Sequence, residues 1–221
     1  NLQMKKYAIV KSTTWLKADP KHTSESISQL VFGQITEIHL ANDIWVLVNT
    51  LDYYYPGYIQ KNHLIEIDDT IFETFSQNTE TYVAGFGCYL QCNNKSKILI
   101  PFGAPLPFLN NSNRTFSLKH LQGYVLRGQV IKTPISLNEI LEDAKKMVGI
   151  VSYVWAGCSN ISGMDCSGFT HILYRLCAIN LARDAYQQAE QGVLVVDEDY
   201  KVGDLLFFRN QTNQITHVGI L

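Results

Sequence analysis

Short stretches in which apolar and polar residues alternate run through the first two-thirds of the chain, and this period of two predicts β-strands. In residues 1–69 these stretches are rich in Ile, Val, Tyr and Trp, and residues that favour turns interrupt them. The expected strands are 35–38, 44–48 and 58–60, with turns at 32–34, 41–43 and 55–57. Closely spaced strands of this kind favour a small β-barrel over residues 1–69.

A second set of alternating stretches follows the acidic segment Glu66-Ile67-Asp68-Asp69, and it predicts a separate β unit over residues 70–133. Pro101, Pro105 and Pro107 indicate a long loop within this unit. The expected strands are 81–84, 89–92, 97–100 and 123–126. Two small β units in tandem are therefore favoured over one large sandwich.

The apolar period changes to that of a helix after Pro134. Residues 136–139, Ser-Leu-Asn-Glu, have the form of a capping box, which satisfies two backbone N–H groups at a helix start. A second helix is expected to begin near Cys166. Its inner face would carry Phe169, Ile172, Leu173, Leu176 and Cys177. Strand patterns return at 204–208 and 216–220, so residues 134–221 predict an α+β domain of helices packed on an antiparallel sheet.

Composition narrows the functional classes. The 221 residues carry a net charge of −2, which argues against a basic nucleic-acid surface. The stretch 81–94, which has no charged residues, contains too many Asn, Gln and Thr residues for a membrane span. The five cysteines include no C-x-x-C pair, so neither a zinc site nor a disulfide-rich scaffold is expected; a disulfide between Cys88 and Cys92 stays open.

Cys166 and His217 are the candidate nucleophile and general base. Cys166 would lie in the first turn of a helix, where the helix dipole favours the thiolate, and Gly168 would let another backbone approach, here the sheet that carries His217. A strand would aim His217 at the thiol. Taken alone, such a Cys is more often a small buried apolar residue. Cys158, expected in a loop, is the rival nucleophile, and His171 is interpreted as structural.

Five ordered sequence blocks give the C-terminal part of the chain a family resemblance. They are Tyr-Val-Trp-Ala-Gly at 153–157, Asp-Cys-Ser-Gly-Phe at 165–169, Arg-Asp-Ala-Tyr-Gln-Gln at 183–188, Gly-Asp-Leu-Leu-Phe-Phe at 203–208 and His-Val-Gly-Ile at 217–220. Residues 153–221 thereby resemble the NlpC/P60 family of cysteine peptidases. The resemblance implies a papain-like catalytic domain over residues 134–221 and no metal or other cofactor.

The N-terminal part resembles bacterial SH3 (SH3b) domains. The matching segments are 16–20, 24–25, 31–33, 44–45 and 55–59 in residues 1–69, and the more divergent 102–107 in residues 70–133. Two SH3-like barrels ahead of an NlpC/P60 domain resemble the layout of the γ-D-glutamyl-L-diamino acid endopeptidases of the dipeptidyl-peptidase VI type. This implies hydrolysis of the bond between D-Glu and the diamino acid in murein stem peptides with a free N-terminal L-Ala.

The resemblance also assigns roles to single residues. Cys166 would attack the γ-amide carbonyl, and His217 would activate the thiol and protonate the leaving amine. Asp184 would pair with the L-Ala ammonium group, and Tyr55 would close the cleft beyond it. Tyr153, Asp165 and Ser167 would line the same site, and the Cys166 N–H would stabilise the oxyanion.

Two departures from the family pattern stand out. Ala185 replaces the usual Ser, which removes one hydrogen bond to the substrate. The residue that orients the base is expected about a dozen positions after the Val-Gly-Ile, past Leu221, so the catalytic domain is expected to be incomplete at its C-terminus. A cell-wall-peptide-binding protein with weak or no catalytic activity, and an amidase or acyltransferase, therefore stay open as alternatives. The expected location is the bacterial cell envelope, the periplasm or the outside of the cell if a signal segment was removed, and the cytoplasm otherwise. A monomer is expected.

Overall fold

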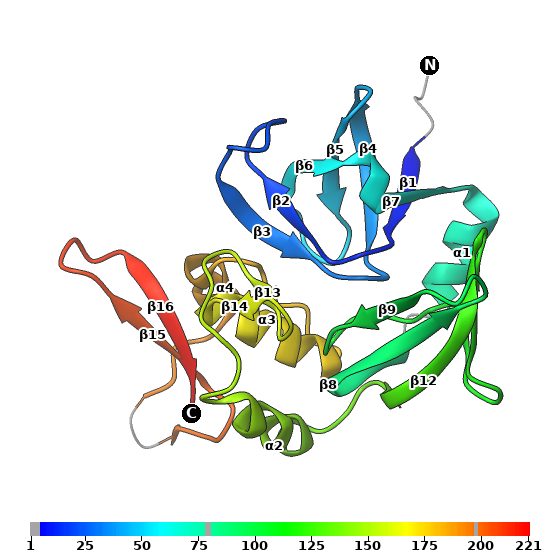
Figure 1. Ribbon diagram of the computed structural model, residues 1–221. Coiled ribbons are helices and arrows are strands. Elements are labelled where there is room, and N and C mark those ends of the chain that lie inside the picture. The colour runs from blue at the N-terminus through cyan, green and yellow to red at the C-terminus, as the bar shows by residue number, and fades with distance from the viewer. Residues whose placement is uncertain (1–4, 78–80, 197–198) are drawn as a thin grey trace. The chain divides into compact units, whose positions relative to one another are not determined.

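The computed structural model describes residues 5–77, 81–196 and 199–221, and Figure 1 shows its elements. Contacts between Cα atoms divide the chain into two compact units, residues 1–133 and 134–221. The boundary predicted after residue 69 lies inside the first unit and separates two antiparallel sheets.

The first sheet contains seven antiparallel strands. They are β1 (Lys6–Val10), β2 (Thr14–Lys17), β3 (Ser26–Leu30), β4 (Ile35–Ala41), β5 (Trp45–Thr50), β6 (Pro56–Gln60) and β7 (Leu64–Ile67), in the order β3-β2-β6-β5-β4-β1-β7. The three strands predicted here correspond to β4, β5 and β6, and the other four were missed. One 3₁₀ turn, η1 (Lys61–His63), connects β6 to β7.

The second sheet contains five antiparallel strands. They are β8 (Thr81–Cys92), β9 (Lys97–Ile100), β10 (Leu109–Asn110), β11 (Thr115–Leu118) and β12 (Leu121–Lys132), in the order β10-β11-β12-β8-β9. Two predicted strands, 81–84 and 89–92, are one long strand. Gly87, at φ +109°, lies within it, and a Cβ there would come within 2.6 Å of the Ile100 carbonyl oxygen.

A helix, α1 (Asp69–Gln77), precedes the second sheet, although the sequence pattern did not predict it. The Asp68 side chain accepts a hydrogen bond of 3.0 Å from the Ile71 backbone N–H, as an N-terminal cap does. The acidic segment that suggested a domain boundary therefore begins a helix.

The two sheets of the first unit share one hydrophobic core. Ile9, Phe32 and Ile65 from the first sheet belong to the same buried cluster as Leu90 and Phe116 from the second. Among the described residues, no strand pairing closes either sheet into a barrel. The two separate SH3-like barrels that the sequence predicts are therefore not shown.

The described residues of the second unit form helices and short antiparallel ribbons (Figure 1). Its elements are α2 (Leu137–Met147), β13 (Cys158–Ser159), β14 (Gly163–Met164), α3 (Cys166–Leu176), α4 (Ala185–Gln191), β15 (Leu205–Arg209) and β16 (Ile215–Ile220). The capping box predicted for α2 is confirmed. The Glu139 carboxylate accepts from the Ser136 N–H at 3.1 Å, and the Ser136 hydroxyl accepts from the Glu139 N–H at 3.4 Å.

Helix α3 begins at Cys166, as predicted, and is buried on nearly all sides. Gly168 allows a close approach, but the neighbour differs from the prediction. A Cβ on Gly168 would lie 2.1 Å from the Gly157 carbonyl oxygen, so the approaching backbone belongs to the loop before β13 and not to the strand that carries His217. Gly168 therefore fixes α3 against the β13–β14 ribbon.

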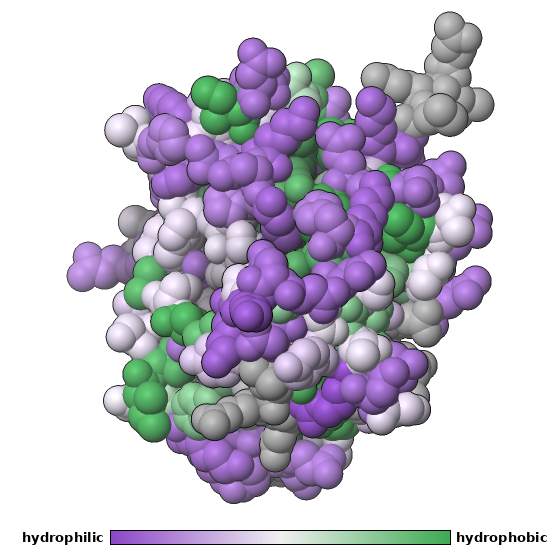
Figure 2. Space-filling view, turned by 45° about the vertical axis from the view of Figure 1, so that its right-hand side comes forward, coloured by the Kyte–Doolittle hydropathy of each residue, from purple (hydrophilic) through white to green (hydrophobic). Residues whose placement is uncertain are grey.

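The face shown in Figure 2 is mostly hydrophilic, and its hydrophobic residues lie in small groups. Within residues 5–77, 81–196 and 199–221, no helix has the length and apolar character needed to cross a bilayer. All five cysteines are free. A Cys88–Cys92 disulfide is therefore not formed, because four residues of an extended strand hold the two side chains roughly 13 Å apart.

Candidate active site

A cavity of about 900 Å³ opens between α2, the first half of α3 and strand β16 of the second unit. Met147, Phe169 and Val218 supply apolar lining, while Cys166 and His217 supply groups that can react. The volume is that of an ordinary small-molecule or peptide site. The cavity therefore brings the predicted nucleophile and base into one lining.

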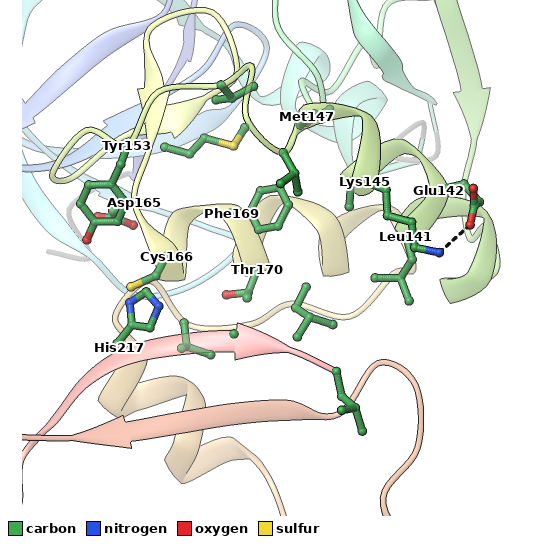
Figure 3. Close-up of a pocket in the computed structure, with 18 of the residues that line it drawn as sticks. Leu141, Glu142, Lys145, Met147, Tyr153, Asp165, Cys166, Phe169, Thr170 and His217 are labelled. Atoms are coloured by element: carbon green, nitrogen blue, oxygen red, sulfur yellow. Dashed lines mark hydrogen bonds and ion pairs between the residues drawn. The ribbon is translucent and has the colours of Figure 1, made fainter.

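The Cys166 side chain projects from the first turn of α3 toward the imidazole of His217 on β16 (Figure 3). Cys166 is half-buried, whereas His217 is exposed. The next residue along β16, Val218, is buried at 3% exposure, so a buried and an exposed side chain follow each other in this strand. On the neighbouring strand, the Phe208 ring lies 5.7 Å from the imidazole between ring centroids.

Tyr153 lies on the same side of the cavity as the thiol (Figure 3). Its hydroxyl lies close enough to the Cys166 side chain for the two groups to influence each other's charge. Partial burial raises the pKa of Tyr153, and the negative charges of Cys166 and Asp165 raise it further, while Arg183 opposes the shift. Tyr153 therefore remains a neutral hydrogen-bond donor beside the sulfur at ordinary pH.

Asp165 is the N-terminal cap of α3, and both of its carboxylate oxygens accept hydrogen bonds. It accepts hydrogen bonds from the Gly168 N–H at 2.6 Å and from the Ala156 N–H at 2.9 Å. The Arg183 guanidinium donates to both carboxylate oxygens, at 3.0 and 2.7 Å. Both side chains are buried, with Arg183 at 1% exposure and Asp165 at 6%. The carboxylate therefore holds the start of α3 in place.

Ser167 faces away from the cavity and into this same cluster. Its hydroxyl donates to Asp165 at 3.3 Å and accepts from Arg183 at 3.0 Å. Gln188 on α4 donates to the Ser167 carbonyl oxygen at 3.0 Å and accepts from Thr170 at 2.7 Å. Polar contacts thus join α4 to the first turn of α3. The substrate-binding role predicted for Ser167 stays a prediction.

Asp184 is half-buried at the N-terminal cap of α4. Its backbone N–H donates to the Gln187 side chain at 3.2 Å, as in a capping box. Ala185 follows as the first helical residue and is buried at 8% exposure. Because Arg183 is anchored to Asp165, the start of α4 lies beside the start of α3. The role predicted for Asp184 stays a prediction.

Tyr55 belongs to the first unit. Its hydroxyl donates to the Ile27 carbonyl oxygen at 3.2 Å, and its ring lies 5.8 Å from that of Tyr53. The predicted part of Tyr55 in closing the cleft stays a prediction.

The other candidate nucleophile and base have structural environments. Cys158 lies in strand β13, not in a loop, and is buried at 1% exposure outside the lining of the cavity. His171 is buried inside α3; its Nδ1 lies 2.7 Å from the Leu181 carbonyl oxygen and its Nε2 lies 2.8 Å from Arg175. Burial, with the positive charge of Arg175, lowers the pKa of His171 well below its usual value.

Sequence reasoning missed Arg183 as part of this site. Arg183 is almost fully buried and pairs with Asp165. No local sequence signal links residues 18 positions apart in this way. Among the described residues, no group of three or more His, Cys, Asp or Glu side chains could hold a metal ion.

The sequence model of the NlpC/P60 family matches residues 150–221. This range contains all of the residues from α3 and β16 that line the cavity. Gamma-D-glutamyl-L-lysine dipeptidyl-peptidase of Bacillus cereus (strain ATCC 10987 / NRS 248) is 30% identical over 183 residues, covering 75% of this chain and 53% of the relative. The enzyme of that name from Bacillus subtilis (strain 168) is 28% identical over 174 residues, covering 75% and 56%. This chain thus spans about half the length of these two relatives.

Two longer matches extend the comparison. Dipeptidyl-peptidase 6 of Lysinibacillus sphaericus is 29% identical over 218 residues, covering 87% of this chain and 78% of the relative. The crystal structure of an NlpC/P60 family protein from Bacillus cereus ATCC 10987 aligns with a TM-score of 0.84 at 21% identity, covering 97% of this chain and 87% of that one. At that identity the structural match establishes a shared fold.

Proposed function

We propose that the protein is a cysteine hydrolase of peptidoglycan peptides, and the match of residues 150–221 to the NlpC/P60 family supports this proposal. The observation that carries the proposal is the meeting of Cys166 and His217 in one cavity (Figure 3). A thiol at a helix N-terminus beside an imidazole is the arrangement that nucleophilic catalysis by cysteine requires.

The proposed reaction has two steps. His217 takes the thiol proton, the Cys166 sulfur attacks the amide carbonyl carbon, and the imidazolium protonates the leaving amine. Water, activated by His217, then hydrolyses the thioester and frees the thiol. The Cys166 backbone N–H, in the first turn of α3, and the Tyr153 hydroxyl are donors within this end of the cavity for the negative charge on the carbonyl oxygen.

We further propose that the bond cleaved is the γ-amide between D-Glu and a diamino acid. The names of the relatives, gamma-D-glutamyl-L-lysine dipeptidyl-peptidase and dipeptidyl-peptidase 6, support this substrate class. A dipeptidyl-peptidase requires a free amino terminus two residues before the bond. Asp184 is the proposed partner of that ammonium group, since the Arg183–Asp165 ion pair ties the start of α4 to the start of α3.

We propose that the two antiparallel sheets of residues 1–133 are SH3-like modules of a cell-wall protein. Their short strands, tight turns and antiparallel order support this interpretation. The proposed location is the cell envelope, where murein peptides occur.

The test is an assay of L-Ala-γ-D-Glu-L-Lys with a free and with an acetylated N-terminus, with products identified by mass. The expected result is release of the L-Ala-D-Glu dipeptide from the free peptide alone, and loss of this product in Cys166→Ala. Cys177→Ala is the matched control, because Cys177 lies half-buried at the opposite end of α3 and should leave turnover unchanged.

Three outcomes would contradict the proposal at different levels. Product from Cys166→Ala would exclude this nucleophile. Equal cleavage of the acetylated peptide would exclude the role of a free amino terminus. Binding of the peptide without any product from the wild-type chain would favour a binding protein.

A further inference from the structure

A buried carboxylate directly precedes the proposed nucleophile. Asp165 is 6% exposed and is adjacent in sequence to Cys166. As a cap it holds the Gly168 N–H at 2.6 Å, which fixes the first turn of α3. An unopposed negative charge at this place would also repel the thiolate, because little water screens it. The capping group and the nucleophile are therefore in electrostatic conflict.

Arg183 resolves this conflict geometrically. Its two terminal nitrogens donate to the two oxygens of Asp165 at 3.0 and 2.7 Å, a paired arrangement that only a guanidinium offers. A further hydrogen bond of 3.0 Å joins it to the Ser167 hydroxyl. With 1% exposure, Arg183 is among the largest fully buried side chains of the described residues. Such burial is costly for an arginine unless its partner is fixed.

Other titratable and charged groups also border the cavity. Tyr153 and His217 are the titratable groups that face the sulfur, and Asp184 begins the next helix. On α2, Glu142 and Lys145 line the cavity but pair with each other at 2.9 Å (Figure 3). On α3 itself, the buried Arg175 contacts His171.

We infer that Arg183 is a positioning residue of this site, which lets Asp165 cap α3 while cancelling its negative charge beside the Cys166 sulfur. The inference rests on the proposed function only in taking Cys166 as the nucleophile. The inference explains why Arg183 is buried beside the start of α3, although its partner Asp165 lies 18 positions earlier in the sequence.

The test is the pH dependence of Cys166 alkylation by iodoacetamide, followed by mass spectrometry of the peptide that contains Cys166. In Arg183→Met the carboxylate loses its counter-charge, so the pH of half-maximal rate should rise by about one unit or more. One unit corresponds to an alkylation rate about tenfold lower on the acid side of the curve. Asp165→Asn should shift the half-maximal pH downward, because the guanidinium is then unopposed.

The double variant Arg183→Met/Asp165→Asn separates charge from packing. It removes both charges and keeps a good capping residue, so the half-maximal pH should return to within about half a unit of the wild-type value. A role in packing alone would lower the melting temperature of Arg183→Met, leave its half-maximal pH unchanged and show no recovery in the double variant. An unchanged half-maximal pH in Arg183→Met, or the absence of recovery in the double variant, would overturn the inference.

The alkylation experiment still tests the inference if one variant fails to fold or if the proposed function is wrong. Should Arg183→Met not fold, Asp165→Asn alone decides, because a rise or no change in its half-maximal pH contradicts the inference. Alkylation requires no substrate. If the half-maximal pH shifts in the expected directions but the chain cleaves no peptide, the inference is supported and the proposed hydrolase is rejected. If the chain cleaves the peptide but the alkylation curves of the variants are unchanged, the hydrolase is supported and the inference is rejected.

Discussion

Two histidines of the second unit occupy opposite environments, although both lie near α3. His171, at 2% exposure, is locked inside the helix, where Nδ1–H donates to the Leu181 carbonyl oxygen and Nε2 accepts from Arg175. His217 is exposed on strand β16 and turns its ring toward the Cys166 sulfur (Figure 3). One imidazole has both nitrogens committed to the protein, and the other faces the cavity.

The difference separates a structural histidine from a candidate base on physical grounds. A base must bind and release a proton near neutral pH at an accessible nitrogen. Burial and the neighbouring Arg175 lower the pKa of His171 well below its usual value, so this imidazole stays neutral. The role of His217 then depends on its surroundings in the cavity. Substitutions at or near the two histidines test whether one acts in catalysis and the other in stability.

The largest expected effect follows from His217→Ala. Loss of the base should reduce kcat/KM by about 10²–10⁴-fold, the usual contribution of general acid–base catalysis. The free energy of unfolding should change by less than about 0.5 kcal/mol, because the side chain is exposed. Peptide hydrolysis and urea unfolding of the same preparation measure the two effects.

His39→Ala provides the matched control for this substitution, since His39 is an exposed histidine on β4 of the first unit. It should leave both quantities unchanged. A variant at His217 that keeps most of its activity would remove the contrast between the two histidines.

The reverse effect is expected for His171→Leu. The substitution leaves the Leu181 carbonyl oxygen without its 2.7 Å hydrogen bond and takes an acceptor from the buried Arg175. We expect a loss of about 2–4 kcal/mol in the free energy of unfolding, with kcat/KM of the folded fraction within about threefold of wild type. His171→Gln, which can still donate and accept, should lose less. A large drop in kcat/KM at full stability would make His171 part of the catalytic machinery.

Local signals in the sequence predicted the parts of the fold that depend on local contacts. The capping box at Ser136 and Glu139 and the start of α3 at Cys166 are confirmed, because neighbouring residues determine them. Helix α1 and the continuity of β8 were missed. Glycines broke the alternation of β8, and only the approach of the Ile100 backbone accounts for Gly87 there. The core shared by the two sheets depends on contacts distant in sequence.

The same distinction applies to the candidate site. Motif spacing identified Cys166 and His217, which the fold brings into one cavity. It could not reveal Arg183, whose partner lies 18 positions earlier, nor that Gly168 packs against Gly157. Both depend on how α3, α4 and the β13–β14 ribbon pack together, which residue order alone does not specify.

A smaller effect is expected in the pH dependence of stability. In the unfolded chain His171 binds a proton below about pH 6.5, whereas the folded chain resists protonation because its pKa is lowered. The unfolded state therefore binds more protons, and stability is full above pH 6.5 and falls by up to about 1.4 kcal/mol per unit below it. The half-buried His63, also with a lowered pKa, adds a smaller slope of the same sign.

Urea unfolding of wild type and His171→Leu at pH 5.0, 6.0 and 7.5 isolates the contribution of His171. The difference in free energy of unfolding between the two proteins should shrink as the pH falls, because the variant has no imidazole to protonate. A constant difference over this range would mean that His171 is protonated in the folded state, contrary to its two hydrogen bonds.

The smallest expected effect concerns the surroundings of His217. Phe208 lies opposite His217 in the β15–β16 pairing, with ring centroids 5.7 Å apart, and is itself half-exposed. Cross-strand contacts of this kind contribute about 0.2–1 kcal/mol, so Phe208→Ala should lower kcat/KM by no more than about fivefold through a less restrained imidazole. Phe208→Tyr keeps the ring and should retain the wild-type rate. Equal losses in both variants would show that something other than the ring contact restrains His217, and a loss comparable to that of His217→Ala would make Phe208 essential to the orientation of the base.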